Sequence, residues 1–426
     1  MNVFKRVGAL ALALTMTATC LAGCSSSGDT STPSSSITVP ESIELTEVND
    51  LFETLSGIPT DTVVATAGDV EITAGQLLYW IAYGADGLYQ YYSMYGLTEM
   101  PWDTTDEDGN SLADTLKSDA LKSAAIYALA PVMAQKEGIE LSEDFTTLVD
   151  STMTQMTAAF GGEETMNYYL WQYPLTIDTY VDMCESEEFN ALLMDARFAE
   201  GGPDYPTDDE VLDYVNNELE LYSVKHILLA SMDTETREPL DEATVAQKKA
   251  TAEDLVAQLR ASDDPIALFD ELMHQYSEDP GLAAYPDGYL ANQKGQMVPE
   301  FEEASLALEV GEISDVVEAE GTGFHIILRL PLEVSAADYR ESYTTQRMTD
   351  LQNSWLEENK VVTNENFDKI APATYYSTLT VLRDAVTAKI EEITAELEAA
   401  QSASGSASAS ASTSADASAA ASSAQG

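Results

Sequence analysis

The chain has 426 residues, of which 45% are hydrophobic and 22% charged, so it can bury more than one core and is not a disordered protein as a whole. Its formal net charge of −55 excludes the basic surfaces that bind nucleic acid or anionic lipid headgroups, and favours cationic or unfolded partners. With 3 cysteines, of which Cys20 and Cys24 lie near the N-terminus, no disulfide framework is expected.

Residues 1–23 have the features of an export signal. Two basic residues precede an apolar run that is too short to be expected to span a membrane. The run ends in Leu-Ala-Gly-Cys24, which resembles the lipobox of bacterial lipoproteins, in which the cysteine is acylated and becomes the new N-terminus. We therefore expect a lipid anchor at Cys24 that holds the protein on the extracytoplasmic side of the cell membrane, followed by a tether over residues 24–60. An ordinary signal peptide is the alternative.

Residues 61–200 are predicted to form a helical, chaperone-like region that begins with a hairpin. Residues 62–73 alternate apolar and polar around Gly68-Asp69, which predicts two short strands. Apolar residues at helical spacing follow. Cys184 lies within this pattern, and we expect it to be a small, buried, apolar residue of a helix. One segment is rich in tyrosine, and two interpretations stay open: a cradle for extended apolar clients, or core packing. Its members are Tyr79, Tyr83, Tyr89, Tyr91, Tyr92 and Tyr95.

A domain boundary is expected at Gly201-Gly202-Pro203, and five separated motifs follow it within residues 221–333. They are Val224-Lys225-His226-Ile227-Leu228-Leu229, Ser277-Glu278-Asp279, Gly295-Gln296-Met297-Val298-Pro299-Glu300-Phe301, Gly311-Glu312-Ile313-Ser314 and Gly323-Phe324-His325-Ile326-Ile327-Leu328. Their order and spacing resemble the parvulin family of peptidyl-prolyl cis/trans isomerases. The resemblance implies a four-stranded sheet with flanking helices, isomerisation of X-Pro bonds, and no cofactor or metal.

The resemblance also assigns the candidate site residues. The polar, catalytic side matches His226, Asp279, Thr322 and His325, and the apolar, substrate-binding side matches Met297, Phe301 and Tyr289. We expect the histidines to act through hydrogen bonding and electrostatics and not as nucleophiles.

The chain departs from the family pattern between residues 289 and 294. Leu290 replaces a usual glycine, and Asn292 stands near a usual phenylalanine. This departure motivates an alternative function, a non-catalytic holdase with a degenerate parvulin domain.

Two helical segments are predicted over residues 336–400, followed by a Ser/Ala tract at 401–426 that is predicted to be disordered because it lacks apolar bulk. The second helical segment either forms a spacer or pairs with a second copy of the chain, which leaves a homo-oligomer open. The expected class is therefore α+β. The whole layout resembles extracytoplasmic foldases of the PrsA/SurA type, which implies that the partners are unfolded or partly folded exported proteins with X-Pro bonds.

Overall fold

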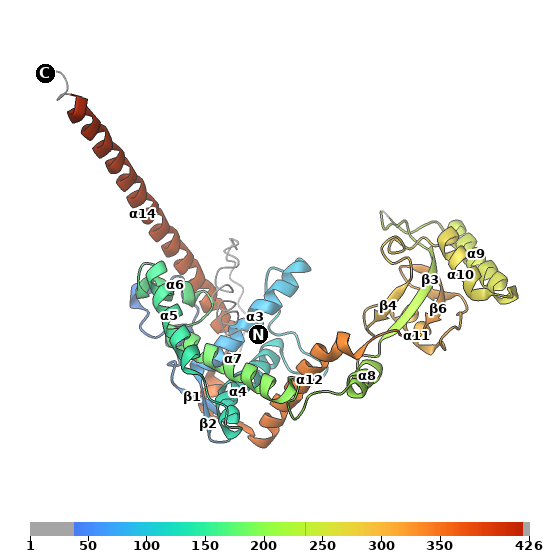
Figure 1. The fold of residues 1–426 in the computed structure, drawn as a ribbon, viewed down its shortest axis with the longest axis horizontal. Helices are drawn as coiled ribbons and strands as arrows, with labels where there is room; N and C mark the ends of the chain where they lie inside the picture. The colour runs from blue at the N-terminus through green and yellow to red at the C-terminus, as the bar shows by residue number, and fades with distance from the viewer. Residues whose placement is uncertain (1–37, 235, 421–426) are drawn as a thin grey trace. The chain divides into compact units, whose positions relative to one another are not determined.

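The fold is known from a computed structural model that describes residues 38–234 and 236–420. The chain divides into two compact units (Figure 1). Unit 1 comprises the chain up to Ala199 together with the chain from Thr349 onward, and unit 2 comprises Glu200–Met348. The predicted export signal and Cys24 lie outside the described residues, so the expected lipid anchor stays a prediction.

Unit 1 is mostly helical and contains one small sheet. Its elements are η1 (Leu45–Glu47), α2 (Leu51–Ser56), β1 (Val63–Ala67), β2 (Val70–Thr73), α3 (Ala74–Met94), α4 (Leu112–Lys136), α5 (Glu143–Ala159), α6 (Glu163–Trp171), α7 (Ile177–Phe198), β7 (Val361–Thr363), α13 (Glu365–Lys369) and α14 (Pro372–Ala420). Local sequence fixes the ends of many helices. At the start of α3, for example, Thr73 and Gln76 form a capping box.

The sheet of unit 1 joins distant parts of the chain in the order β2-β1-β7. The predicted hairpin is confirmed, since β1 and β2 pair antiparallel around Gly68, whose φ of 60° suits a glycine. Strand β7 pairs with the other edge of β1, and α14 packs against α2, α3, α4 and α6. The C-terminal segments therefore complete the core of the N-terminal region.

Helix α14 contributes to this core through Leu379, Leu382 and Val386, all fully buried. Leu382 and Val386 lie in the second predicted helical segment, for which pairing with a second copy of the chain was one of two open interpretations. Because unit 1 already covers them, they offer no surface for a second copy.

Two segment boundaries differ from the prediction. Within the expected tether at 24–60, Asp50 caps α2, and Leu51, Phe52 and Leu55 are buried, so the folded region begins earlier than the Ser/Pro-rich composition indicated. At the other end, α14 continues to Ala420, through most of the tract expected to be disordered. Composition shows only that this tract cannot bury a core, whereas alanine has the highest helix propensity and favours a helix.

The tyrosine cluster on α3 divides between the two open interpretations. Tyr79 is half-buried and packs against the core formed by α5, α6 and α7, in which Cys184 is also buried. In contrast, Tyr83, Tyr91 and Tyr95 are 63%, 51% and 70% exposed. Tyr89 and Tyr92 are half-buried, so the cluster is divided between packing and exposure residue by residue.

Unit 2 is built on a four-stranded antiparallel sheet in the order β4-β3-β6-β5. Its elements are α8 (Asp208–Asn217), β3 (Tyr222–Ala230), α9 (Glu242–Ala261), α10 (Pro265–Tyr276), β4 (Tyr289–Asn292), α11 (Pro299–Ala307), β5 (Val317–Ala319), β6 (Gly323–Leu330) and the first part of α12 (Ala336–Glu358). The predicted α+β class and four-stranded sheet are confirmed.

The two faces of this sheet carry different residues because side chains alternate along a strand. Ile227 and Leu229 of β3 pack with Ile326 of β6 against α9 and α10. On the opposite face, Val224 of β3 and Ile327 of β6 pack against α11. The candidate site residues of β3 and β6 belong to this second face.

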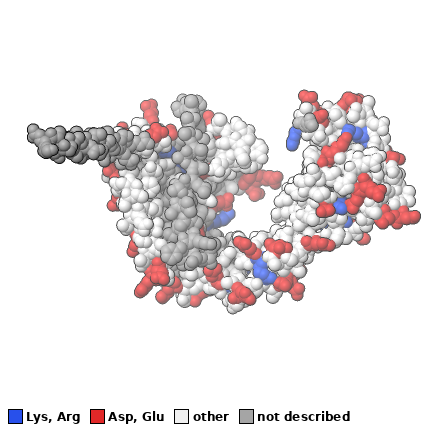
Figure 2. Space-filling model, turned by 45° about the horizontal axis from the view of Figure 1, so that its top comes forward, with Lys and Arg blue, Asp and Glu red and all other residues white. Residues whose placement is uncertain are grey.

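Acidic side chains are spread over the surface drawn in Figure 2, where Lys and Arg are few, in line with the net charge of −55. Among the residues that the structure describes, no helix combines the length and the apolar character needed to cross a membrane.

Candidate functional site

Two buried histidines on neighbouring strands form the centre of the candidate site. In the register of β3 and β6, His226 lies opposite Ile327, and Leu228 lies opposite His325. The two histidines are therefore diagonal neighbours on one face of the sheet. Their rings stack with an interplanar angle of 11°, and the two Nδ1 atoms are 3.1 Å apart, within hydrogen-bond distance.

Asp279 is held beside His226 by a segment that runs along the edge of β3. Ser277 Oγ accepts a hydrogen bond from Leu228 N, and the Glu278 carboxylate accepts one from Ala230 N. These contacts place Asp279 Oδ2 3.0 Å from His226 Nε2. The motif Ser277-Glu278-Asp279 thus combines two anchoring residues with one site residue.

The environment keeps Asp279 ionised. Burial alone would raise its pKa, but hydrogen bonds from His226, from the Gly281 N–H and from the Tyr289 hydroxyl lower the pKa to about 2. A carboxylate in this state can only accept hydrogen bonds.

Thr322 closes the network on the far side of His325. Its Oγ1 lies 3.0 Å from His325 Nε2 and 3.2 Å from the carbonyl oxygen of Ala319. The next residue, Gly323, has a φ of 144°, and a Cβ there would lie 2.3 Å from Leu229 O, so only glycine lets the turn into β6 approach β3 this closely. Burial is the larger and the electrostatic effect of nearby His226 the smaller of two causes that lower the pKa of His325 to about 3. This ring is therefore neutral near neutral pH.

The predicted apolar side is formed from α11 and the residues before it. Phe301 is 3% exposed, and its ring lies 5.1 Å from the ring of His226 and 5.2 Å from that of His325, measured between centroids. Met297 is half-buried and packs on the same cluster. Phe301 therefore packs against both imidazole rings. Met297 lies beside it and is partly exposed to solvent.

Tyr289 lies in the site but differs in character from its prediction. It was expected on the apolar, substrate-binding side, whereas its hydroxyl donates a hydrogen bond of 2.8 Å to Asp279 Oδ2. The ring also contacts His226 edge to face, with 5.5 Å between centroids. The prediction for Tyr289 came from a family position that usually holds a large apolar residue. Such a residue has no hydroxyl, so the hydrogen bond to Asp279 was not predicted.

The structure thus brings together all seven candidate residues of unit 2. Sequence reasoning assigned no role to Ser277, Glu278 and Gly281, which position Asp279 through hydrogen bonds. Their place next to Asp279 was the only signal. The third histidine, His274, is exposed on α10 and takes no part in the network.

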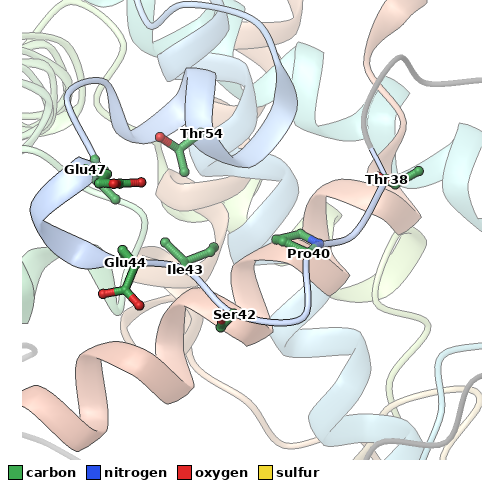
Figure 3. Close-up of a pocket in the computed structure, with 8 residues that line it drawn as sticks. Thr38, Pro40, Ser42, Ile43, Glu44, Glu47 and Thr54 are labelled. Carbon is green, nitrogen blue, oxygen red and sulfur yellow. The ribbon is translucent and has the colours of Figure 1, made fainter.

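A separate surface pocket lies in unit 1, around η1 and the start of α2 (Figure 3). Its lining includes Pro40, Ile43, Glu44 and Glu47 but none of the candidate site residues. It presents no converging set of catalytic side chains and is not part of the site.

Comparison with known families and proteins identifies the domain around this site. Residues 226–330 match the family model "Rotamase: PPIC-type PPIASE domain". The predicted resemblance to parvulins is therefore confirmed for this part of the chain.

Two curated proteins that are similar to this chain share the name foldase protein PrsA. The chain is 27% identical over 246 residues to a foldase protein PrsA of Halalkalibacterium halodurans, covering 55% of this chain and 65% of that protein. It is 32% identical over 196 residues to a foldase protein PrsA of Oceanobacillus iheyensis, covering 46% of this chain and 49% of that protein. The matches thus span about half to just under two thirds of these relatives.

Among solved structures, a PrsA peptidylprolyl isomerase of Bacillus cereus aligns with 66% of this chain and 99% of its own, at 19% identity and a TM-score of 0.29.

Proposed function

We propose that the chain is a peptidyl-prolyl cis/trans isomerase that accelerates the folding of exported proteins. The observation that carries the proposal is the hydrogen-bonded row of Thr322, His325, His226 and Asp279 packed on Phe301, within a domain that matches the rotamase model. Acylated Cys24 would hold this foldase at the outer face of the cytoplasmic membrane.

The chemistry of the reaction suits such a site. Rotation about an X-Pro bond crosses a barrier of roughly 18–20 kcal/mol, because amide resonance is lost when the C–N bond twists. No covalent bond to the enzyme is needed, so a nucleophile brings no advantage. An apolar contact with the proline ring from Met297 favours the less polar twisted amide, and the buried network supplies a fixed local field.

An assay of X-Pro isomerisation by the mature chain tests the proposal. We expect His226→Ala and Asp279→Ala each to lower kcat/KM by about 100-fold, because either change interrupts the network. His274→Ala is the matched control, since His274 is exposed and lies outside the network. Equal activity in all three variants and the unchanged chain would refute the site, and absence of any acceleration by the unchanged chain would refute the function.

A second function, the holding of unfolded chains without catalysis, is favoured by the end of α3. There Tyr91, Met94 and Tyr95 are 51%, 77% and 70% exposed, and the rings of Tyr91 and Tyr95 lie 5.1 Å apart. The adjoining residues 96–116 contain acidic residues and no Lys or Arg. Such a surface fits extended segments that combine aromatic and basic side chains.

Suppression of aggregation of an unfolded basic protein separates the two functions. Replacing Tyr91, Met94 and Tyr95 with serine should weaken the suppression and leave isomerisation of short peptides unchanged. The control replaces Ile266 and Val310 with serine. These two apolar residues of unit 2 are 49% and 63% exposed. Equal suppression by all these variants would contradict a holding surface on α3.

The proposed anchor is tested by the distribution of the full chain between membrane and soluble fractions of cells. Cys24→Ser should move the protein from the membrane fraction, whereas Cys20→Ser should not. Membrane retention of the Cys24→Ser variant would show that the anchor is not a lipid on this residue.

A further inference from the structure

The phenolic hydroxyl of Tyr289 occupies a specific place in the network. Asp279 Oδ2 accepts from both His226 Nε2, at 3.0 Å, and the Tyr289 hydroxyl, at 2.8 Å, while Oδ1 accepts from Gly281 N at 3.0 Å. Strand pairing orients the ring: Tyr289 lies opposite Val224, two residues before His226 on β3, so both side chains are on the same face of the sheet. The contact therefore follows from the sheet register.

The loop that carries Asp279 is shaped around this hydroxyl. A Cβ on Gly281 would lie 2.0 Å from the Tyr289 oxygen and 3.1 Å from the ring carbon that bears it. Any larger residue at position 281 would thus displace the hydroxyl. This steric relation is independent of the hydrogen bond and indicates that Gly281 makes room for Tyr289.

The direction of the hydrogen bonds follows from the chemistry of each group. Ionised Asp279 only accepts, so His226 Nε2 carries a proton, and a neutral His226 accepts at Nδ1 from the Nδ1–H of His325. His325 Nε2 then accepts from the Thr322 hydroxyl. If Thr322 instead donated to Ala319 O, His325 Nε2 would have to donate, and the shared Nδ1 contact would require a protonated histidine. A carboxylate beside Nε2 favours the cationic form of His226, so a hydrogen bond that disperses the charge of Asp279 favours the neutral pair.

We propose that Tyr289 is a positioning residue of the isomerase site, whose hydroxyl holds Asp279 against His226 and shares its negative charge, which keeps the histidine pair neutral and in one tautomer. The inference rests on the proposed isomerase function and deepens it. Three titratable groups face His226 or its partners: Asp279, His325 and Tyr289, with Tyr285 against the far side of the Tyr289 ring, 5.0 Å between centroids. From α11 the neighbour is apolar Phe301.

The test is the ¹⁵N NMR titration of the histidine rings in the mature chain, combined with the pH profile of kcat/KM. The chain has 3 histidines, so the signals of His226 and His325 can be assigned with single variants. In Tyr289→Phe the carboxylate loses a donor and acts more strongly on His226. We expect the pH midpoint of the pair to rise by about 0.5–1 unit. We expect kcat to fall by about tenfold with little change in KM.

Tyr285→Phe is the matched control, because Tyr285 is 54% exposed and contacts the ring of Tyr289, not Asp279. It should leave the titration and the pH profile unchanged. An unaltered midpoint and pH profile in Tyr289→Phe would overturn the proposal.

A double-variant cycle adds a second readout. Gly281→Ala should reproduce the shift and the loss seen in Tyr289→Phe, because the added Cβ displaces the hydroxyl. In the Tyr289→Phe background the same alanine should have little further effect. Fully additive effects would contradict the proposal. If the unchanged chain shows no isomerase activity, the proposed function fails, whereas the histidine titrations still decide the role of Tyr289.

Discussion

The two units use buried and half-buried polar groups in different ways. In unit 2, His226, His325 and Asp279 form a network whose members come from adjacent strands and from a loop tied to one of them. In unit 1, Arg383 of α14 donates two hydrogen bonds of 2.7 Å to the Asp86 carboxylate of α3 and a third to the carbonyl oxygen of Gln172. The first arrangement contains groups that titrate and can support chemistry, and the second is a cross-link between helices.

The difference bears on the kind of functional surface that each unit can carry. A sheet fixes the relative positions of side chains on one face, which a site with defined hydrogen bonds requires. Helix α3, by contrast, ends in exposed aromatic residues that suit adaptable contacts with many sequences.

The two units can be followed separately by spectroscopy. All 4 tryptophans belong to unit 1, namely Trp80, Trp102, Trp171 and Trp355. Tryptophan fluorescence therefore reports on unit 1, while circular dichroism reports on both units.

The largest effect is expected from Phe301→Ala, which would test whether the two units unfold separately. Removal of this buried ring should cost about 3–5 kcal/mol of the free energy of unfolding of unit 2. In denaturant, the circular dichroism signal should show an earlier transition, while the midpoint of tryptophan fluorescence stays in place. An equal shift of both signals would show that the units unfold as one.

A smaller effect, in the opposite unit, is expected from Arg383→Met. Loss of the paired guanidinium should cost about 2–3 kcal/mol, since Asp86 keeps the Tyr376 hydroxyl as a donor but loses its counter-charge. Here the tryptophan transition should shift while isomerisation of short peptides is retained. Lys389→Met, on the same helix, removes only a surface pair with Glu392 and should change stability by less than about 0.5 kcal/mol.

Acid should destabilise unit 2 through His325. The pKa of this ring is about 3 in the folded chain, below its ordinary value of 6.5, because the buried ring resists charging. Between these two pH values the unfolded state binds the additional proton, so stability is complete above pH 6.5 and declines as the pH falls toward 3.

We expect a loss on the order of 2 kcal/mol, measured by denaturant unfolding at a series of pH values. The variant His325→Gln should have a weaker dependence on pH in this window, and His274→Gln should behave as the unchanged chain. An equally steep dependence in His325→Gln would assign the acid sensitivity to other groups.

The smallest effect is expected from Met297→Ala, which should change binding and leave stability nearly unchanged. Met297 is half-buried at the edge of the apolar side, so its loss should weaken the binding of proline peptides by about 1–1.5 kcal/mol, seen as a rise in KM. Val310→Ala, an exposed apolar residue of the same unit, is the control. An unchanged KM would remove Met297 from the binding side.

Much of unit 2 could be predicted because its motifs are local runs of sequence. The resemblance of these motifs to the parvulin family implied the four-stranded sheet and assigned His226 and His325 to the site. In unit 1, the alternation of residues 62–73 around Gly68-Asp69 predicted the hairpin, and the helical spacing of apolar residues predicted the helices that follow. Composition was less informative at the ends, where it did not predict α2 within the tether or the extension of α14 to Ala420.

The class of the fold and the motifs of unit 2 could be recognised in the sequence because they depend on periodicity and on residues close together in the chain, and the resemblance of these motifs to the parvulin family supplied the site residues. The folded chain was needed to show that β7 joins β1, that Leu382 and Val386 are covered, which tyrosines of the cluster are exposed, and that the Tyr289 hydroxyl meets Asp279. The physical reason is that strand register and packing between distant segments set these contacts, and neither leaves a periodic signal in the sequence.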